Sequence, residues 1–222
     1  CVSTETCNYH KKRFATKIDR TATAGISENG ANTKMISIGI PVFNQAEFLS
    51  DAIESALTQK YDFDWEVVIV DDGSNDNSFE IAQRYAEENP LKIQLISQVN
   101  KGLASARNTI LMNAVGSWLL YLDSDDMLQD NAIARIEEEI RNHPEADIIA
   151  PSMKCFGLNN DPVILMPEPK IEDFRAGNRI GYCAAVRKSI LLAVGGYDPT
   201  MIWGYEDLML WCVLLSRGAK LI

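Results

Sequence analysis

Short apolar runs alternate with helix-like patterns from residue 35 onwards, and this alternation limits the possible folds more than any other feature. The runs suit strands that are buried on both faces of a parallel sheet, and they cover residues 36–42, 65–70, 93–96, 118–122 and 148–150. Between the first two runs, apolar side chains recur at steps of three and four residues, as on a helix packed against a sheet. The alternation predicts an α/β fold with a doubly wound, mostly parallel sheet and helices on both faces.

The alternation weakens after Pro151, which predicts a second and less regular half. Residues 154–166 resemble a hairpin around a polar turn at 159–161, and a strand is expected at 180–186. A helix is expected at 188–194, closed by Gly195, and a last helix is expected to end at Gly218.

The composition favours one globular domain and argues against a nucleic-acid-binding protein. A chain of 222 residues with 46% hydrophobic content can bury one sizeable core. Its formal net charge is -10, and no basic block is interleaved with aromatic residues. An anionic ligand therefore has to be bound by local groups.

Residues 1–34 are expected to form a polar, partly disordered leader, because they carry six Lys or Arg against three acids with little apolar periodicity. The basic residues at 11–20 suit an anionic membrane surface, although a solvated tail is favoured. Five cysteines without a CxxC pair indicate a reducing, cytoplasmic setting. With no apolar run of about 18 residues, we expect at most peripheral association with the inner face of the cell membrane.

Three acidic clusters follow apolar strands or begin a helix, and their position is the main functional signal of the sequence. They are Asp71-Asp72-Gly73-Ser74, Asp123-Ser124-Asp125-Asp126 and Glu206-Asp207. Because the carboxyl ends of the strands line the ligand crevice of an open α/β sheet, we expect the first two clusters to face one site. Each cluster alone also has a structural explanation, as a turn, a helix cap or a favourable charge at a helix start.

The crowding of carboxylates at 123–126 indicates a metal site. A helix cap needs one oxygen acceptor, whereas neighbouring carboxylates repel one another unless a cation lies between them. Mg²⁺ and Mn²⁺ prefer carboxylate and phosphate oxygens, and Mg²⁺ is commonly held by one or two carboxylates together with substrate phosphates. The sequence has no GxxxxGK[ST] or GxGxxG loop, and its two histidines lack the spacing of a zinc site. We therefore expect phosphate to be bound through a divalent metal.

From about residue 35 to its end, the chain resembles family 2 of the inverting glycosyltransferases, which have the GT-A fold. The segments that match follow one another in the order of that family: Pro41-Val42-Phe43-Asn44 with Glu47 and Leu49; Val70-Asp71-Asp72-Gly73-Ser74 with Asp76; Asn100-Lys101-Gly102 with Ala106-Arg107-Asn108; Leu122-Asp123-Ser124-Asp125-Asp126; Gly195-Gly196-Tyr197-Asp198; and Gly204-Tyr205-Glu206-Asp207.

The resemblance implies a site for a nucleotide-diphosphate sugar, with a UDP-sugar favoured. It implies that the nucleoside is held by Pro41, Phe43, Asn44, Glu47, Asp71 and Asp72. Lys101 and Arg107 are expected near the base or the diphosphate, and Arg107 has the alternative role of structural partner to Asp71. Asp123, Ser124 and Asp125 match the DxD motif, with Asp125 as the direct ligand of Mn²⁺ or Mg²⁺ and Asp123 nearer the ribose. Asp126 is expected to cap a helix.

The resemblance also implies transfer with inversion to a hydroxyl of a glycan, lipid-linked or protein acceptor. Asp207 is the expected base, with Glu206 as the alternative base or as a sugar contact. Trp203 and Tyr197 are expected either to line the sugar pocket or to pack in the core. Residues 35–126 would form the nucleotide-binding half and residues 127–222 the acceptor-side half. The chain ends before a further ligand, often a histidine, that many relatives supply, so we expect its C-terminus to be truncated.

Three other functions share part of this pattern. A sugar-phosphate nucleotidyltransferase needs a glycine-rich basic loop near its N-terminus, which residues 36–49 lack. A non-catalytic nucleotide-sugar-binding domain would lack the base or the metal ligand, whereas Asp207 and Asp125 are both present. A glycoside hydrolase uses two carboxylates that flank one bond and has no need of the DDGS or DxD segments.

Overall fold

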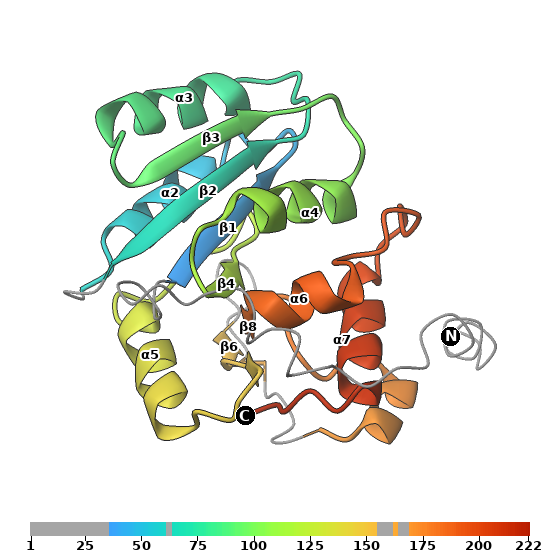
Figure 1. Cartoon of the computed structure of the whole chain (residues 1–222). Helices are drawn as coiled ribbons and strands as arrows, with labels where there is room; N and C mark the ends of the chain where they lie inside the picture. Colours follow the sequence, from blue (N-terminus) through green and yellow to red (C-terminus); the bar gives the residue numbers. More distant parts are fainter. Residues whose placement is uncertain (1–35, 61–63, 155–161, 164–168) are drawn as a thin grey trace.

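A six-stranded, mostly parallel sheet forms the centre of the protein, as the sequence predicts (Figure 1). The computed structural model describes residues 36–60, 64–154, 162–163 and 169–222, so the leader and the turn at 159–161 lie outside it. The strands lie in the order β3 (Ile93–Ser97), β2 (Trp65–Asp71), β1 (Ile36–Val42), β4 (Trp118–Tyr121), β8 (Ala185–Arg187) and β5 (Ile148–Ile149). The first four strands run parallel, and β8 is antiparallel to both of its neighbours.

Helices cover both faces of this sheet. One face packs against α2 (Leu49–Leu57), α3 (Ser78–Glu88) and α5 (Ala132–Asn142), and the other against α4 (Leu103–Asn113), α6 (Lys188–Val194) and α7 (Glu206–Ser216). Alternate residues of β2 serve the two layers: Val67 and Ile69 pack with α2 and α3, and Val68 and Val70 pack with α4. This double burial explains why the strand sequences are continuously apolar.

The strand order places a topological switch point between β1 and β4. The chain runs outward from β1 through β2 to β3 and then returns to β4 on the other side of β1. Because crossovers between parallel strands are right-handed, this reversal moves α4 to the face opposite α2 and α3. In Figure 1, α4 lies in front of β1. Ligands of open α/β sheets bind at the carboxyl ends of the strands where such a reversal occurs.

The second half is less regular, as expected, and the strand predicted at 180–186 is shorter than the apolar run suggests. The strand β8 pairs with β4 through Ala185 to Arg187 and with β5 through Ala185 and Val186, and no strand among the described residues pairs with 180–184. The expected hairpin contains the short strands β6 (Met153–Lys154) and β7 (Pro162–Val163), and a 3-10 helix, η2, spans Ile171–Ala176. Among the described residues, no helix is long and apolar enough to cross a membrane.

The close approach of α4 to β1 depends on the absence of a side chain at Gly39. A Cβ atom there would lie 2.4 Å from Cγ2 of Ile110 and 3.4 Å from Cδ1 of Tyr121. Since Ile110 and Tyr121 are fully buried, neither side chain can turn towards solvent. A glycine at this point of β1 lets α4 lie directly on the sheet.

We predict that Gly39→Ala lowers the free energy of unfolding by about 1–3 kcal/mol, the usual cost of an overpacked core. Ile110→Ala should cost about 2–5 kcal/mol through the cavity it leaves. The double variant should lose less than the sum of the two, because the methyl group at position 39 enters that cavity. Urea denaturation of the four proteins measures the three differences. Strict additivity would mean that Gly39 is not held against Ile110.

Candidate active site

The loops after β1 and β2 are fastened to each other by side chains of the DDGS region. The backbone N–H of Asn44 donates to Oγ of Ser74 (3.0 Å), and the N–H of Asn75 donates to Oδ1 of Asn44 (2.7 Å). The N–H of Ala46 donates to Oδ2 of Asp76 (3.1 Å). Asn44 also has a left-handed backbone (φ 53), which asparagine tolerates better than most residues. Asn44 therefore shapes the loop, and its contact with a nucleoside stays a prediction.

Asp72 fastens the loop that precedes α4. Its carboxylate accepts hydrogen bonds from the N–H groups of Lys101 (2.9 Å) and Gly102 (2.8 Å) and from Nε2 of Gln98 (2.6 Å). Asp72 is 2% exposed, so these donors compensate its burial. In the structure, Asp72 holds the loop that carries Lys101. The nucleoside contact expected for Asp72 from the sequence stays a prediction. The side chain of Lys101 itself is exposed.

Of the two aspartates of the DDGS segment, Asp71 has the weaker internal hydrogen bonds. It is 2% exposed, and its two oxygens accept only long hydrogen bonds, from the N–H of Ser74 (3.3 Å) and from Oγ of Ser97 (3.4 Å). A buried carboxylate with spare acceptor capacity suits a ligand that brings an N–H donor. Among the predicted nucleoside residues nearby, Pro41 is buried in β1, and Phe43 (44% exposed) and Glu47 are open to solvent.

Arg107 of α4 joins the end of β4 to the beginning of α7. Its side chain is 1% exposed, and its two terminal nitrogens donate to Oδ1 of Asp123 (2.7 Å) and to Oε1 of Glu206 (2.5 Å). The predicted alternative that Arg107 pairs with Asp71 is therefore wrong. A guanidinium that is buried this deeply is not accessible to a ligand. Its burial therefore argues against direct contact with the base or diphosphate of a nucleotide. Because Glu206 is 6% exposed and bound to Arg107, it is poorly suited to act as a base.

Three tyrosines surround the buried guanidinium. The rings of Tyr121, Tyr182 and Tyr197 lie 5.8, 5.7 and 5.4 Å from its central carbon, within the range of cation–π attraction. Tyr121 also donates its hydroxyl hydrogen bond to the carbonyl oxygen of Arg107 (2.9 Å). Tyr197 is 1% exposed, so of the two predicted roles it has the one in the core.

Asn108, next to Arg107, holds the turn that follows α6. The N–H of Tyr197 donates to Oδ1 of Asn108, and Nδ2 of Asn108 donates to the carbonyl oxygen of Tyr197, both at 2.8 Å. Gly196 has a φ of 75°, and a Cβ atom there would lie 2.3 Å from Oδ1 of Asn108. Two segments that match the family therefore contact each other: Ala106-Arg107-Asn108 and Gly195-Gly196-Tyr197.

The carboxylates at 123–126 have unequal surroundings. Asp125 is exposed, Ser124 is buried, and Asp126 accepts a hydrogen bond from the hydroxyl of Tyr182. The prediction that Asp126 caps a helix is wrong, because α5 begins at Ala132 with Asn131 at its N-cap. Burial raises the pKa of Asp123, and Arg107 opposes this rise. Burial and the charges of Asp125 and Asp123 raise the pKa of Asp126 to about 6.

The donor set at this turn fits a divalent cation that also binds phosphate. Asp125 has no internal hydrogen bond among those the structure describes, and Oδ2 of Asp123 is not the oxygen that binds Arg107. Within the described ranges, no group of three or more His, Cys, Asp or Glu side chains could hold a metal ion by itself. One or two carboxylates are the usual protein share of a Mg²⁺ site completed by substrate phosphates.

Asp207 lies half-buried in the first turn of α7 and follows Glu206, which the guanidinium of Arg107 links to Asp123. Its Oδ2 accepts a hydrogen bond from Nδ2 of Asn178 (2.7 Å). Burial raises the pKa of Asp207, hydrogen bonds from the N–H of Leu208 and from Asn178 lower it, and the charge of Glu206 raises it. The contact of Asn178 with Asp207 was not predicted from the sequence. A single asparagine in a polar stretch carries no pattern that links it to a residue 29 positions away.

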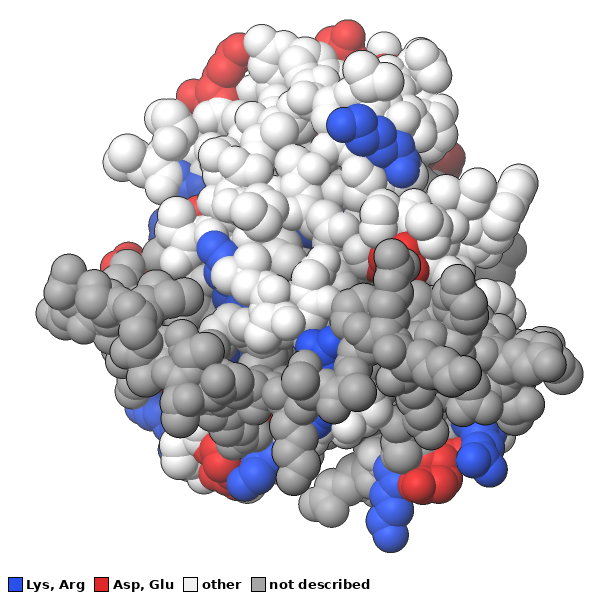
Figure 2. All heavy atoms as spheres, turned by 45° about the vertical axis from the view of Figure 1, so that its right-hand side comes forward, with Lys and Arg blue, Asp and Glu red and all other residues white. Residues whose placement is uncertain are grey.

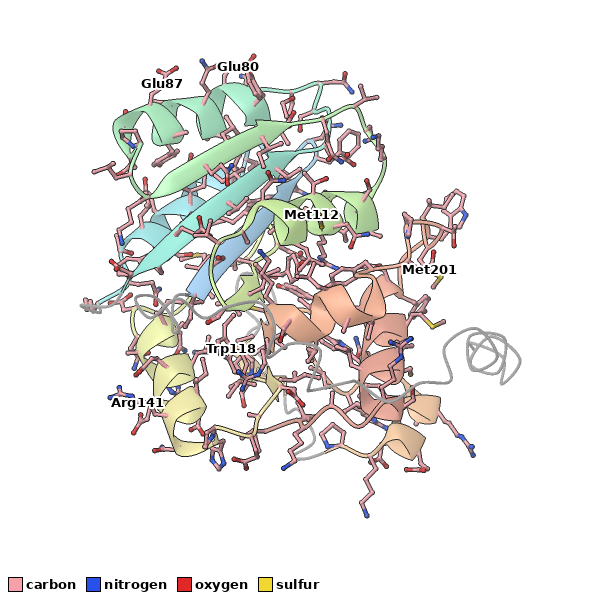
Figure 3. All side chains as sticks on the ribbon, in the orientation of Figure 1. Glu80, Glu87, Met112, Trp118, Arg141 and Met201 are labelled. Carbon is pink, nitrogen blue, oxygen red and sulfur yellow. The ribbon has the colours of Figure 1, made fainter. Side chains whose placement is uncertain are left out.

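The loop before α7 presents apolar side chains to solvent. Trp203 is 91% exposed, Ile202 is 64% exposed and Tyr205 is 61% exposed. Core packing, one of the two roles predicted for Trp203, is therefore excluded. Met201, labelled in Figure 3, marks this loop where it projects beside α7. Figure 2 shows basic and acidic side chains interspersed on one face of the described part of the molecule.

The arrangement of carboxylates at the carboxyl edge of the sheet agrees with a comparison of the sequence with known families. A model of the family described as "Glycosyl transferase family 2" matches residues 37–195. The chain belongs to glycosyltransferase family 2. The match covers the crevice from β1 to the Gly195 turn, and α7 with Asp207 lies beyond it.

Curated relatives have the names of glycosyltransferases or of polysaccharide synthases. An uncharacterized glycosyltransferase, EpsJ of Bacillus subtilis, is 36% identical over 115 residues, which are 52% of this chain and 33% of that protein. A chondroitin synthase of Escherichia coli is 39% identical over 107 residues, which are 48% of this chain and 15% of that protein. The chain thus spans a third or less of the length of these two relatives.

Solved structures share the fold. Residues 1–349 of S. aureus TarS in complex with UDP-GlcNAc superpose with a TM-score of 0.71 at 22% identity, over 84% of this chain and 55% of that one. The mannosyltransferase PcManGT of Pyrobaculum calidifontis, in complex with GDP-Man and Mn²⁺, gives a TM-score of 0.63 at 21% identity, over 84% and 53%. Both likenesses confirm the predicted GT-A type of α/β fold.

We predict that Arg107→Met lowers the free energy of unfolding by about 3–5 kcal/mol, because it leaves two carboxylates without their cation in a buried site. Glu206→Gln combined with Arg107→Met should cost less than the sum of the single changes, since it removes one of those stranded charges. Arg135→Met, at an exposed position of α5, is the matched control and should change stability by less than about 0.5 kcal/mol. Urea denaturation measures the free energy of unfolding of the two single variants, the double variant and the control. A loss no larger than that of the control would contradict the central role of Arg107.

Proposed function

We propose that this chain is the donor-binding and catalytic domain of an inverting glycosyltransferase that uses a nucleoside-diphosphate sugar. The observation that carries the proposal is the ion-paired group Asp123, Arg107 and Glu206, which ties the carboxylates after β4 to the helix turn that presents Asp207. In the proposal, this ion-paired group holds a metal-binding carboxylate and a base at the same end of the sheet. The structural neighbours with UDP-GlcNAc and GDP-Man in their titles support a donor of this class.

In this proposal, residues 35–126 bind the nucleotide and residues 127–222 bind the acceptor. Asp71 offers acceptor oxygens to a base N–H, and Pro41, Phe43 and Glu47 line the same end of β1. Lys101 and Ser124 border the diphosphate and ribose. Asn44, Asp72 and Arg107 act by holding these groups in place. A UDP-sugar is the favoured donor, and the acceptor is a hydroxyl of a glycan, a lipid-linked glycan or a protein.

Asp125 and Asp123 would hold the divalent cation, Mn²⁺ or Mg²⁺. When bound, such an ion acts as a Lewis acid that stabilises the negative charge developing on a departing diphosphate. The chain's own contribution is to fix Asp123 through Arg107 and to leave the exposed Asp125 facing the crevice edge. The neighbour whose title includes Mn²⁺ supports metal use in this fold.

Asp207 would act as the general base. An acceptor hydroxyl attacks the anomeric carbon, its proton passes to the Asp207 carboxylate, and the bond from the anomeric carbon to the diphosphate oxygen breaks. Nucleoside diphosphate leaves with the electron pair of that bond. One displacement from the opposite face inverts the anomeric centre, so a single base suffices. The pKa of Asp207, raised by burial, makes it a stronger base than an exposed aspartate.

We predict that UDP raises the melting temperature of the chain when Mn²⁺ or Mg²⁺ is present and much less when the metal is chelated. Asp125→Asn should remove most of the metal-dependent part of the shift, because it removes the exposed carboxylate ligand. Glu87→Gln, in the last turn of α3 (Figure 3), removes one negative charge at the end of that helix away from the DDGS loop and should leave the shift unchanged. Thermal-shift measurements with UDP, GDP and dTDP test donor and metal together. An equal shift with and without chelator would contradict the metal site.

We predict that Asp207→Asn retains UDP binding and abolishes sugar transfer, because an amide cannot accept the proton. In the parent chain, kcat should fall as the pH is lowered through the pKa of Asp207, and the fall should begin at a higher pH than the ordinary aspartate value of 3.8 would give. The measurements are a UDP thermal shift and the pH profile of transfer from a UDP-sugar. Transfer by Asp207→Asn at the parent rate would remove Asp207 as the base.

A further inference from the structure

Asn178 reaches Asp207 from a part of the chain with no other assigned role. It lies just after η2, which packs against α7, and follows Gly177, whose φ of 131° only glycine adopts readily. Oδ1 of Asn178 accepts a hydrogen bond from the N–H of Ile180 (3.2 Å), and Nδ2 donates to Oδ2 of Asp207 (2.7 Å). Because the turn fixes the oxygen end of the amide, the nitrogen end is directed at the carboxylate.

The Asp207 carboxylate is thus held at both oxygens. Oδ1 accepts from the N–H of Leu208 (2.7 Å), and Oδ2 accepts from Asn178. Two donors on different oxygens set the plane of a carboxylate, and each oxygen keeps a further lone pair for an incoming hydroxyl. The first donor belongs to the helix itself, so among the described residues it is Asn178 that orients the carboxylate against another part of the fold.

We propose that Asn178 is a positioning residue for the base, fixing the orientation of the Asp207 carboxylate and stabilising its charged form by the hydrogen bond to Oδ2. The inference rests on the proposed function, in which Asp207 takes the proton of the acceptor hydroxyl. It adds to that function a residue from outside the acidic segments, on an element that packs beside the catalytic helix.

The groups around Asp207 define what loss of this hydrogen bond should do. Glu206, on the same helix, disfavours the charged carboxylate, and Arg107 from α4 favours it. Tyr197, from the turn after α6, is fully buried and uncharged. The charged residues on and after η2 are Glu172, Asp173, Arg175 and Arg179. Since burial already raises the pKa of Asp207, removal of a donor should raise that pKa further.

The test replaces the donor while leaving the turn intact. Asn178→Asp keeps an oxygen for the N–H of Ile180 and replaces the amide donor with a second carboxylate. Asn178→Ala removes both ends of the amide. Asn113→Ala is the matched control, because Asn113 is likewise exposed and makes one comparable side-chain hydrogen bond, to the carbonyl oxygen of Thr109 (2.8 Å) at the far end of α4. Carbon-13 NMR titration of labelled aspartate carboxyls, assigned with Asp207→Asn, measures the pKa of Asp207 without any need for an acceptor.

We expect the pKa of Asp207 to rise in the order parent, Asn178→Ala, Asn178→Asp, with Asn113→Ala equal to the parent. The acid limb of the kcat profile for transfer from a UDP-sugar should move by the same amount. At its plateau, kcat of Asn178→Ala should fall about tenfold, well short of the ~10²–10⁴-fold that a general base contributes as a whole. The UDP-dependent thermal shift should not change.

Two results overturn the inference and are distinct from failure of the proposed function. If the pKa of Asp207 is the same in Asn178→Asp and the parent, Asn178 does not act on the carboxylate. If kcat falls equally at every pH while the pKa stays constant, Asn178 only ties η2 to α7. Failure of the proposed function would appear elsewhere, as full transfer activity in Asp207→Asn.

Discussion

A buried positive charge organises the carboxyl edge of the sheet in this protein. The guanidinium of Arg107 is 1% exposed and lies between Asp123 and Glu206, which come from β4's end and from the beginning of α7. A charge in that position is stable only while its partners and their hydrogen bonds are in place, so three elements that are distant in the sequence must meet there. The tyrosines around it shield the ion pairs from water and strengthen them.

This constraint also separates the roles of two adjacent acids. Glu206 is held by the arginine and completes the ion-paired core, whereas Asp207, one residue later on the helix, accepts a hydrogen bond from Asn178. The helix start thus supplies one carboxylate to the structure and one to the proposed chemistry. A similar division holds at β2, where Asp72 fastens a loop with close hydrogen bonds and Asp71 keeps acceptor capacity for a ligand.

Several residues of the segments that match the family have an architectural role. Asn44, Asp72 and Asn108 each bind backbone groups of a neighbouring loop, and Gly196 leaves room for one of those contacts. These bonds hold the strand ends of a parallel sheet, where four connections converge, in one fixed arrangement. In the proposed function, a metal-binding carboxylate and a base must keep a constant separation, so these residues would support catalysis indirectly by holding the loops in place.

The sequence by itself determined the α/β class, the parallel core, most helix positions and the three acidic clusters, because periodicity and strand-end chemistry are local properties of the chain. The predicted burial of the strand at 118–122 is confirmed, and its Trp118 is 1% exposed. Only the tertiary structure decided that Arg107 pairs with Glu206, 99 residues away, rather than with Asp71, that Asp126 caps no helix, and that Asn178 meets Asp207. Those outcomes depend on where α4, η2 and α7 cross the end of the sheet, and packing across the whole molecule sets such crossings, which no local pattern encodes.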